Sequence, residues 1–174
     1  MQGLTLALTL HKRNIACKIF ERNPGGSVLG GSLTLAPNAL AIFQNLGLYD
    51  EIKTHSYPLQ HMWFKKSDGE TAGRYFFGHR SAFGYDALRL ERKQLMEVLN
   101  SKALACGIPI IPKAFSNASK APGGDGIISH FADGTTEMSS LLVGADGIHS
   151  VVRSLIPGNG HSDPTYTGFL AMNT

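Results

Sequence analysis

Apolar and polar positions alternate in short blocks along this chain, and their spacing predicts the order of its elements. In residues 2–12 four leucines stand on alternate positions, which by itself suits a strand. The interleaved Ala7, and the basic Lys12 and Arg13 in the last turn, suit a mostly buried helix at least as well. Residues 15–22 follow as a β-branched and aromatic run ended by Asn-Pro-Gly-Gly, which predicts a buried strand and a loop.

Two longer segments carry a helical period. Pro37 stands at a first helical position, and the helix that it begins ends at Gly47. Residues 90–107 give the clearest helix, with Gly107 just past its end. Its predicted apolar side consists of Leu95, Val98, Leu99 and Leu104.

Strand patterns fill most of the remaining chain. Two hairpins are predicted, around residues 67–69 and around Asp133-Gly134, and residues 108–113 predict a single strand. Residues 140–147 predict a buried strand that runs into a turn, with a short helix after it at 148–155. Helices mixed with parallel and antiparallel strands in this order predict an α/β layer with an antiparallel piece folded in.

Composition narrows the class of protein. A chain of 174 residues, 43% hydrophobic and 17% charged, is one ordinary domain or a larger domain cut short. The formal charge of +3 is scattered, which argues against nucleic-acid binding. Its two cysteines predict reduced thiols rather than a disulfide or a metal site. No stretch approaches the roughly 18 apolar residues of a membrane span, so we expect a cytoplasmic protein.

One candidate site lies near the start of the chain. Gly3 precedes the apolar helix, and Glu21 ends the strand that follows. In a dinucleotide-binding βαβ unit, the last glycine of the phosphate loop opens the helix, and an acid at the end of the second strand binds a ribose. Glu21 fits that role. A Gly and a Glu at this spacing are not specific by themselves, because a Glu at the end of a strand is more often only a solvated residue.

A second candidate site follows the predicted strand at 140–147. Asp146 would stand at the carboxyl end of that strand, where open α/β sheets place their ligands. Gly147 would let the backbone turn beside a ligand, and a helix starting near Ile148 would point free N–H groups at a phosphate. The alternative is structural: Asp146 caps the helix, Ser150 binds nearby backbone, and Arg153 is a surface charge.

These segments together resemble the FAD-dependent aromatic hydroxylases, the single-component flavoprotein monooxygenases that include the salicylate and para-hydroxybenzoate hydroxylases. The resemblance is carried by "LVGADGIHSVVR", which is similar to the family's Asp-Gly fingerprint, and by four further segments in the same order. They are "GLTLALTLHKRNIACKIFER", "GGSLTLAPNALAIFQNLGL", "LERKQLMEVL" and "PTYTGFLAMN". The likeness covers essentially the whole chain, as a fragment truncated at both ends.

The resemblance implies a fold and a set of cofactor-binding residues. The fold is an incomplete, Rossmann-like FAD-binding layer of the glutathione-reductase type, with an inserted antiparallel hairpin that belongs to a substrate sheet. Residues 1–174 would be a partial FAD-binding domain, in which 57–85 and 164–174 begin the substrate-binding sheet. The residues implied to bind the cofactor are Gly3, Glu21, Arg22, Gly30, Gly31, Arg92, Asp146 and Gly147.

The resemblance also implies a reaction, in which NAD(P)H reduces FAD and O₂ is used to hydroxylate a small aromatic substrate. The cofactor performs the oxidation, so no residue is named catalytic and no metal is expected. Two alternatives stay open: a flavin-dependent halogenase or reductase on the same scaffold, or a non-catalytic fragment with weak or no FAD binding. The oligomeric state is left open.

Overall fold

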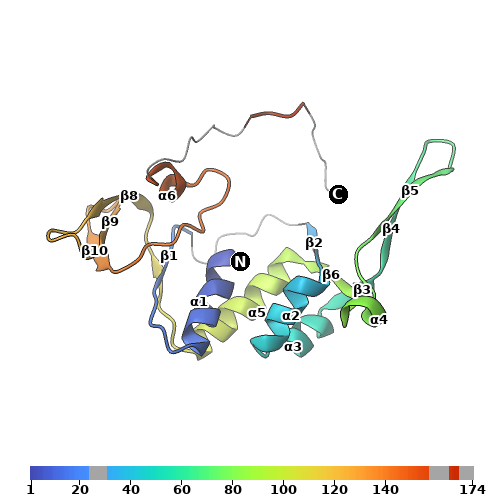
Figure 1. The fold of residues 1–174 in the computed structure, drawn as a ribbon, viewed down its shortest axis with the longest axis horizontal. Coiled ribbons are helices and arrows are strands. Elements are labelled where there is room, and N and C mark those ends of the chain that lie inside the picture. Colours follow the sequence, from blue (N-terminus) through green and yellow to red (C-terminus); the bar gives the residue numbers. More distant parts are fainter. Residues whose placement is uncertain (24–30, 157–164, 169–174) are drawn as a thin grey trace. The chain divides into compact units, whose positions relative to one another are not determined.

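The computed structural model describes residues 1–23, 31–156 and 165–168 of the chain, whose elements are drawn in Figure 1. They divide into two compact units. We name the units by their place in the sequence. The central unit is Ser27–Ala105 together with Met1, and the flanking unit is Gln2–Gly26 together with Cys106–Thr174. Among the described residues, no helix is both long and apolar enough to cross a membrane.

The central unit joins a three-stranded sheet to helices. Its elements are β2 (Ser32–Leu35), α2 (Pro37–Asn45), α3 (Tyr49–Thr54), β3 (Ser56–Leu59), β4 (His61–Lys65), β5 (Thr71–Phe76), α4 (Arg80–Phe83), β6 (Ala87–Glu91) and α5 (Arg92–Ala105). Strand β6 lies between β2 and β3, antiparallel to both. Helix α5 contacts β6, and α3 contacts α2, α5 and β3.

Alternation along β6 gives this sheet two different faces. Leu88 and Leu90 are buried, whereas Arg89 between them is exposed. Successive side chains of a strand point to opposite faces, so the leucines mark the face that packs on the helices. Leu40, Leu48, Ile52 and Leu99 are almost fully buried and form the centre of this core.

Both predicted helices of the central unit are confirmed. Pro37 is the first residue of α2, where its fixed φ suits the helix and its missing N–H is not needed. In α5, Leu95, Val98 and Leu99 are buried as expected. Leu104 is 65% exposed, so its assignment to the buried side was wrong.

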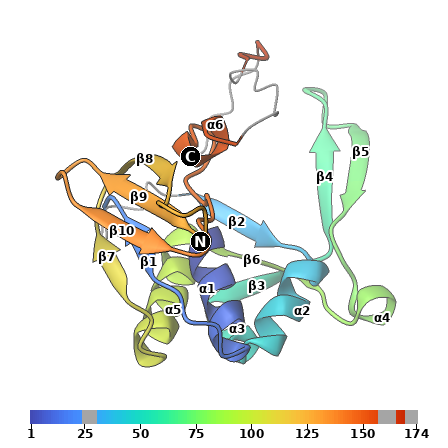
Figure 2. The ribbon, with the colours of Figure 1, turned by 60° about the vertical axis from the view of Figure 1, so that its left-hand side comes forward.

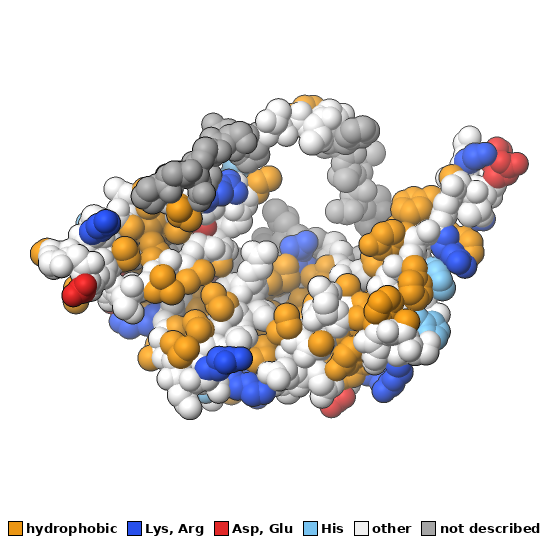
Figure 3. Space-filling model, viewed as in Figure 1, with side chains coloured by type: hydrophobic (Ala, Val, Ile, Leu, Met, Phe, Trp, Pro, Cys, Tyr) orange, Lys and Arg blue, Asp and Glu red, His pale blue; other side chains and the backbone are white. Residues whose placement is uncertain are grey.

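Strands β4 and β5 form the first predicted hairpin, closed at Lys66 and Glu70 by a backbone hydrogen bond of 2.9 Å. The hairpin carries exposed aromatic side chains on both strands: Trp63, Phe64, Tyr75 and Phe76. Arg74 of β5 lies over the ring of Trp63 on β4, 5.3 Å from its centroid. Figure 3 shows these apolar side chains along the hairpin, with charged groups gathered at its tip.

Gly78 is the glycine of the central unit, among those that the structure describes, where a side chain fits least. A Cβ built there would lie 2.7 Å from Pro37 Cγ and 3.1 Å from the backbone nitrogen of Ala87. We expect Gly78→Ala to lower the free energy of unfolding by about 1–3 kcal/mol, because the start of α2 must move. Urea denaturation measures this change.

The matched control for Gly78 is Gly73→Ala, in the hairpin, where the added methyl group would meet only Phe64 at 3.9 Å. That variant should stay within about 0.5 kcal/mol of the parent chain. Equal losses from the two substitutions would contradict the steric explanation.

The flanking unit combines a parallel strand pair with a three-stranded meander, seen in Figure 2. Its elements are α1 (Gln2–Lys12), β1 (Ile19–Glu21), β7 (Ile110–Pro112), β8 (Phe115–Lys120), β9 (Ile127–Phe131), β10 (Thr136–Ser139) and α6 (Val151–Ser154). Strands β1 and β7 are parallel, whereas β8, β9 and β10 are antiparallel in chain order. Residues of β1 and β9 pack through Phe20 and Phe131, whose ring centroids are 4.6 Å apart.

The flanking unit confirms some predictions and corrects others. The helix at residues 2–12, the strand at 108–113 and the hairpin around Asp133-Gly134 are present. The strand predicted at 15–22 is only Ile19–Glu21 and is partly exposed. The buried strand predicted before Asp146 was wrong, because Leu141 and Val143 are 74% and 51% exposed and no strand forms there. No described segment pairs with this stretch, so its backbone lacks the partner that a strand needs.

Candidate functional site

The turn at residues 144–147 is organised around the carboxylate of Asp146. One carboxylate oxygen accepts a hydrogen bond from the Ser150 hydroxyl at 2.5 Å. The other accepts from the backbone nitrogen atoms of Val151 at 2.7 Å and Val152 at 3.3 Å. Asp146 therefore holds the first turn of α6 in the structure, as the alternative interpretation of its sequence expected.

Ser150 is the N-cap residue of α6. Its hydroxyl oxygen accepts a hydrogen bond from the Arg153 backbone nitrogen at 3.0 Å. The helix begins at Val151 rather than near Ile148. The side chains of Asp146 and Ser150 thus already occupy the N–H groups that were expected to face a phosphate.

The charge state of Asp146 follows from these contacts. Burial alone would raise its pKa, but hydrogen bonds from Ser150 and from the N–H groups of Val152 and Val151 outweigh that effect. The pKa of Asp146 therefore lies below the ordinary value of 3.8. At neutral pH the side chain is a carboxylate.

This lowered pKa predicts how α6 responds to acid. A carboxyl group with a lowered folded-state pKa contributes stability fully above its ordinary pKa and loses it as pH falls through the folded value. We expect the amide signals of Val151 and Val152 to move toward unstructured positions only at pH below 3.8. An NMR titration measures this, and Ser150→Ala should shift the midpoint upward. A downward shift in the variant would contradict the assignment.

Two glycines fix the shape of this turn. Gly147 has φ of +85°, a conformation that side chains rarely adopt, and a Cβ there would meet nothing within 4 Å. At Gly144 a Cβ would lie 2.7 Å from Val152 Cβ, so α6 approaches the backbone closely. Gly144 belongs to the Asp-Gly fingerprint segment, but no role was predicted for it. The Gly-Ala-Asp-Gly spacing was the signal that could have found it.

Gly3 lies against the same turn. A Cβ built at Gly3 would be 3.4 Å from Ala145 Cβ, next to Asp146 in the chain. Gly3 and Ala145 are 142 positions apart in the chain (145 − 3) and still lie close together in the flanking unit. Two segments singled out separately from the sequence are therefore brought together.

Glu21 and Arg22 stand at the carboxyl end of β1, and both are exposed. The Glu21 carboxylate accepts a hydrogen bond from the Asn23 backbone nitrogen at 3.1 Å. A carboxylate can accept several hydrogen bonds, so Glu21 keeps capacity for a further donor.

Gly31 and Arg92 of the central unit are also brought together. Gly31 has φ of +94°, and its carbonyl accepts a hydrogen bond from the Arg92 backbone nitrogen at 3.2 Å. This bond follows the β2–β6 ladder, in which Ser32 is opposite Glu91. Arg92 is the first residue of α5 and is exposed. Gly30 lies outside the described residues.

Each unit, taken by itself, carries groups of the kinds that bind parts of FAD. In the flanking unit the carboxylates of Glu21 and Asp146 are acceptors for sugar hydroxyl groups, and nothing lies within 4 Å of a Cβ built at Gly147. In the central unit the Arg92 guanidinium suits a phosphate. Within the part of the chain that the structure describes, no group of His, Cys, Asp or Glu side chains could hold a metal ion.

Sequence comparison gives the family. A family model described as "FAD binding domain" matches residues 1–174. The 3-amino-4-hydroxybenzoate 2-monooxygenase of Streptomyces cremeus is 30% identical over 170 residues, which cover 96% of this chain and 42% of that enzyme. The FAD-dependent monooxygenase nvfK of Aspergillus novofumigatus is 33% identical over 156 residues, which cover 88% of this chain and 33% of nvfK.

Solved structures share the fold. HpxO of Klebsiella pneumoniae, crystallised with FAD and uric acid, matches with a TM-score of 0.72 at 24% identity, covering 88% of this chain and 39% of that one. The flavin-dependent monooxygenase PieE, crystallised with FAD and substrate, matches with a TM-score of 0.73 at 23% identity, covering 87% and 29%. These matches confirm the α/β fold and the resemblance drawn from the sequence. Among the proteins named here, nvfK is an FAD-dependent and PieE a flavin-dependent monooxygenase, and the chain belongs to the FAD-binding domain family.

Proposed function

We propose that this chain is the FAD-binding portion of a flavin-dependent monooxygenase that hydroxylates an aromatic or phenolic small molecule with NAD(P)H and O₂. The observation that carries the proposal is the closeness of Gly3 to the Ala145–Asp146 turn. The two segments that would bind the phosphate region of a dinucleotide lie near each other there, in a chain whose relatives are named monooxygenases. The chain spans less than half the length of those relatives.

In the flanking unit, the proposal assigns the sugars of FAD to two acids. Glu21 would accept hydrogen bonds from the adenosine ribose, with Arg22 beside it. Asp146 and Gly147 would contact the ribityl and pyrophosphate region. Because Ser150 and the start of α6 already bind the Asp146 carboxylate, they also hold that side chain in one orientation.

In the central unit, Gly31 and Arg92 are assigned to the same cofactor, and so is Gly30. When bound, FAD supplies the electron transfer and the activation of oxygen. The residues of this chain bind and orient it, and none is assigned a proton-transfer or nucleophilic step.

The proposal extends to the arrangement of domains. Residues 1–174 would be a partial FAD-binding layer of the glutathione-reductase type, with 57–85 and 164–174 contributing to a substrate-binding sheet. Within the described residues, β3 pairs with β6, whereas β4 and β5 pair only with each other. Residues 164 and 169–174 lie outside the described residues.

The test of the function uses the protein expressed from its complete open reading frame. We expect bound FAD, NAD(P)H oxidation that phenols accelerate, and transfer of one atom of ¹⁸O₂ to the aromatic product, measured by mass spectrometry. A halogenated product, or reduction without oxygen transfer, would overturn the assignment in favour of a different flavoenzyme.

A further inference from the structure

Helix α4 is a single turn between β5 and β6, on the path by which the chain returns from the hairpin to the β2–β6–β3 sheet. The carbonyl of His79 accepts hydrogen bonds from the N–H groups of Ala82 at 3.0 Å and Phe83 at 2.9 Å. The N–H group of Gly84, a residue with φ of +79°, donates to the carbonyl of Arg80 at 2.8 Å. A helix this short is not stable by itself, so α4 depends on the groups that bind its ends.

Two side chains bind the first N–H groups of α4. The Asp86 carboxylate accepts a hydrogen bond from the Arg80 N–H group at 3.1 Å, and the same oxygen accepts one from the Gln60 side chain at 3.1 Å. Nδ1 of His79, the N-cap residue, lies 3.2 Å from the Ser81 backbone nitrogen and 2.7 Å from the Ser81 hydroxyl. Helix N-caps are usually Ser, Thr, Asp or Asn, whose oxygen atoms remain acceptors at neutral pH. At α4 the acceptor is instead an imidazole nitrogen.

The Ser81 N–H group fixes the protonation state of His79 in this structure. A backbone N–H group only donates, so the ring nitrogen that it faces must be the unprotonated one of a neutral imidazole. Histidine is the side chain that changes charge between about pH 5 and 8, and both of its ring nitrogen atoms are donors once it is protonated. The Ser81 hydroxyl can then rotate and accept, whereas the Ser81 N–H group cannot. Protonation therefore removes the cap from the backbone.

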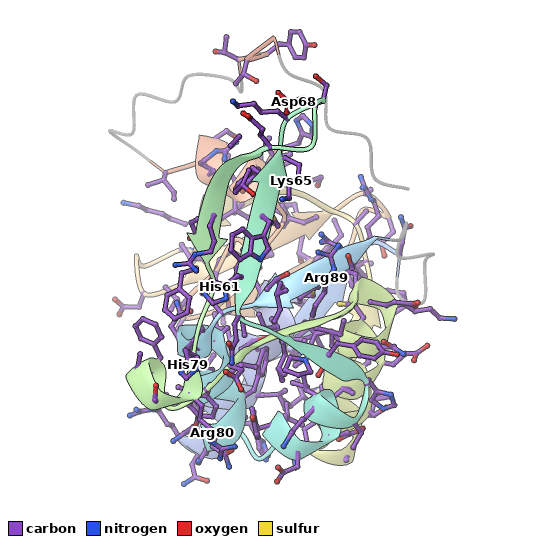
Figure 4. The ribbon with its side chains drawn as sticks, turned by 90° about the vertical axis from the view of Figure 1, so that its right-hand side faces the viewer. His61, Lys65, Asp68, His79, Arg80 and Arg89 are labelled. Atoms are coloured by element: carbon purple, nitrogen blue, oxygen red, sulfur yellow. The ribbon has the colours of Figure 1, made fainter. Side chains whose placement is uncertain are left out.

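We propose that His79 is a pH-sensitive cap, which holds α4 when the imidazole is neutral and releases it when the imidazole is protonated. Phe83 carries the effect to the hairpin, because its ring centroid is 5.8 Å from that of Phe76 on β5. The Phe76 ring also packs on His61 of β4, at 5.1 Å. Figure 4 shows His79 and Arg80 at α4, and His61 where β4 begins. Release of α4 therefore loosens the base of the hairpin in mild acid.

Other groups near α4 are separated from His79 by their pH range. Helix α2, which packs against Gly78, carries no charged residue, and α3 reaches this loop through Tyr49, whose ring centroid is 5.2 Å from that of Tyr85. The charged groups on the neighbouring elements are Asp50, Glu51, Lys53, Arg74, Arg80 and Asp86. Carboxyl, ammonium and guanidinium groups as classes keep their charge between about pH 5 and 8. Two histidines, His61 of β4 and His55 at the end of α3, share the range of His79, so each requires a control.

This inference goes beyond the proposed function, because no residue of α4 is assigned to the cofactor. The cap belongs to the central unit, whereas FAD binding at Gly3, Glu21 and the Asp146 turn is measured in the flanking unit. A helix that ignores pH would leave the flavin assignment intact. A chain that does not bind FAD would leave the cap intact.

The first test is an NMR titration of the unmodified chain from pH 8 to pH 5. We expect the ¹³Cα shifts of Ser81 and Ala82 to lose their helical values with the same midpoint as the His79 ring signals. The ratio of formed to unformed α4 should fall about 2- to 30-fold, as for the loss of an N-cap. The ring-to-ring cross-peak between Phe76 and Phe83 should weaken in step. Helical shifts that stay constant, or that follow the ring signals of another histidine, would overturn the inference.

The second test replaces the ring by a cap that does not titrate. His79→Asn keeps a side-chain acceptor at the N-cap, so α4 should stay formed at both pH values. His79→Ala removes the acceptor, and its α4 at pH 8 should resemble that of the unmodified chain at pH 5. The matched controls His61→Asn and His55→Asn should keep the response of the unmodified chain. A response that survives in His79→Asn, or an α4 that this variant lacks at both pH values, would overturn the inference.

Discussion

Replacing Asp146 by alanine is expected to weaken FAD binding by about 10- to 100-fold, since a hydrogen bond to a charged group contributes about 1.5–3 kcal/mol. The substitution removes the proposed acceptor for the ribityl region. It also removes the group that binds Ser150 and the first N–H groups of α6. Flavin fluorescence titration measures the dissociation constant.

The matched control for Asp146 is Asp133→Ala, in the turn between β9 and β10 of the same unit. Asp133 also accepts hydrogen bonds from a backbone nitrogen and a hydroxyl, both of Thr135, and these hydrogen bonds lower its pKa. Losing that carboxylate should leave FAD affinity within about twofold, because the effect on this turn is local. An equal loss of affinity in both variants would show that Asp146 acts only through the stability of the unit.

Gly144→Ala is expected to be nearly as damaging as the loss of Asp146. The new methyl group would lie 2.7 Å from Val152 Cβ and 3.2 Å from an Asp146 carboxylate oxygen. The start of α6 must therefore move away, which costs about 1–3 kcal/mol and breaks the hydrogen bonds from Val151 and Val152. We expect an FAD affinity at least about 10-fold lower, together with loss of the α6 amide signals.

A second substitution tests the steric reason for that effect. Val152→Gly removes the atoms that the new methyl group meets, so the double variant should recover FAD affinity despite the cost of about 1 kcal/mol for a glycine in a helix. Gly73→Ala is the control, because its methyl group would meet only Phe64, at 3.9 Å, and Gly73 is not assigned to the cofactor. A double variant as weak as Gly144→Ala alone would mean that the close approach of α6 is not the cause.

The sequence predicts the elements that have either a long run of apolar residues at regular spacing or a distinctive turn. Helix α5 has enough apolar positions at helical spacing to be found directly, and both hairpins are marked by Asp-Gly turns. Strands β2, β3, β6 and β8 were not predicted. Strand β8 is polar and exists through pairing with β9. Helix α5 follows β6 without a break, and the last residues of β6 were predicted as part of that helix.

The predicted strand before Asp146 shows the opposite error. Residues 141–143 are as apolar as a buried parallel strand, and the pattern predicted one. A strand also requires a neighbour for its backbone hydrogen bonds, and the described residues provide none there. Local sequence gives the preference for a strand, whereas tertiary pairing decides whether one forms.

The residues of the candidate site were named from the sequence, but most of the hydrogen bonds among them were not. Gly3 and the Asp146 turn were identified separately, and the structure places them close together. The sequence offered helix capping by Asp146 as an alternative, but the exact partners, the Ser150 hydroxyl and the Val151 N–H group, depend on where α6 begins and could not be predicted.

Titration of FAD into the unmodified chain, followed by NMR, shows whether the flavin binds at Gly3, Glu21 and the Asp146 turn. We expect saturable binding that shifts the signals of Gly3, Glu21 and residues 145–147 together, with matching dissociation constants. Saturable shifts confined to other residues, or no shifts at all in excess FAD, would contradict it.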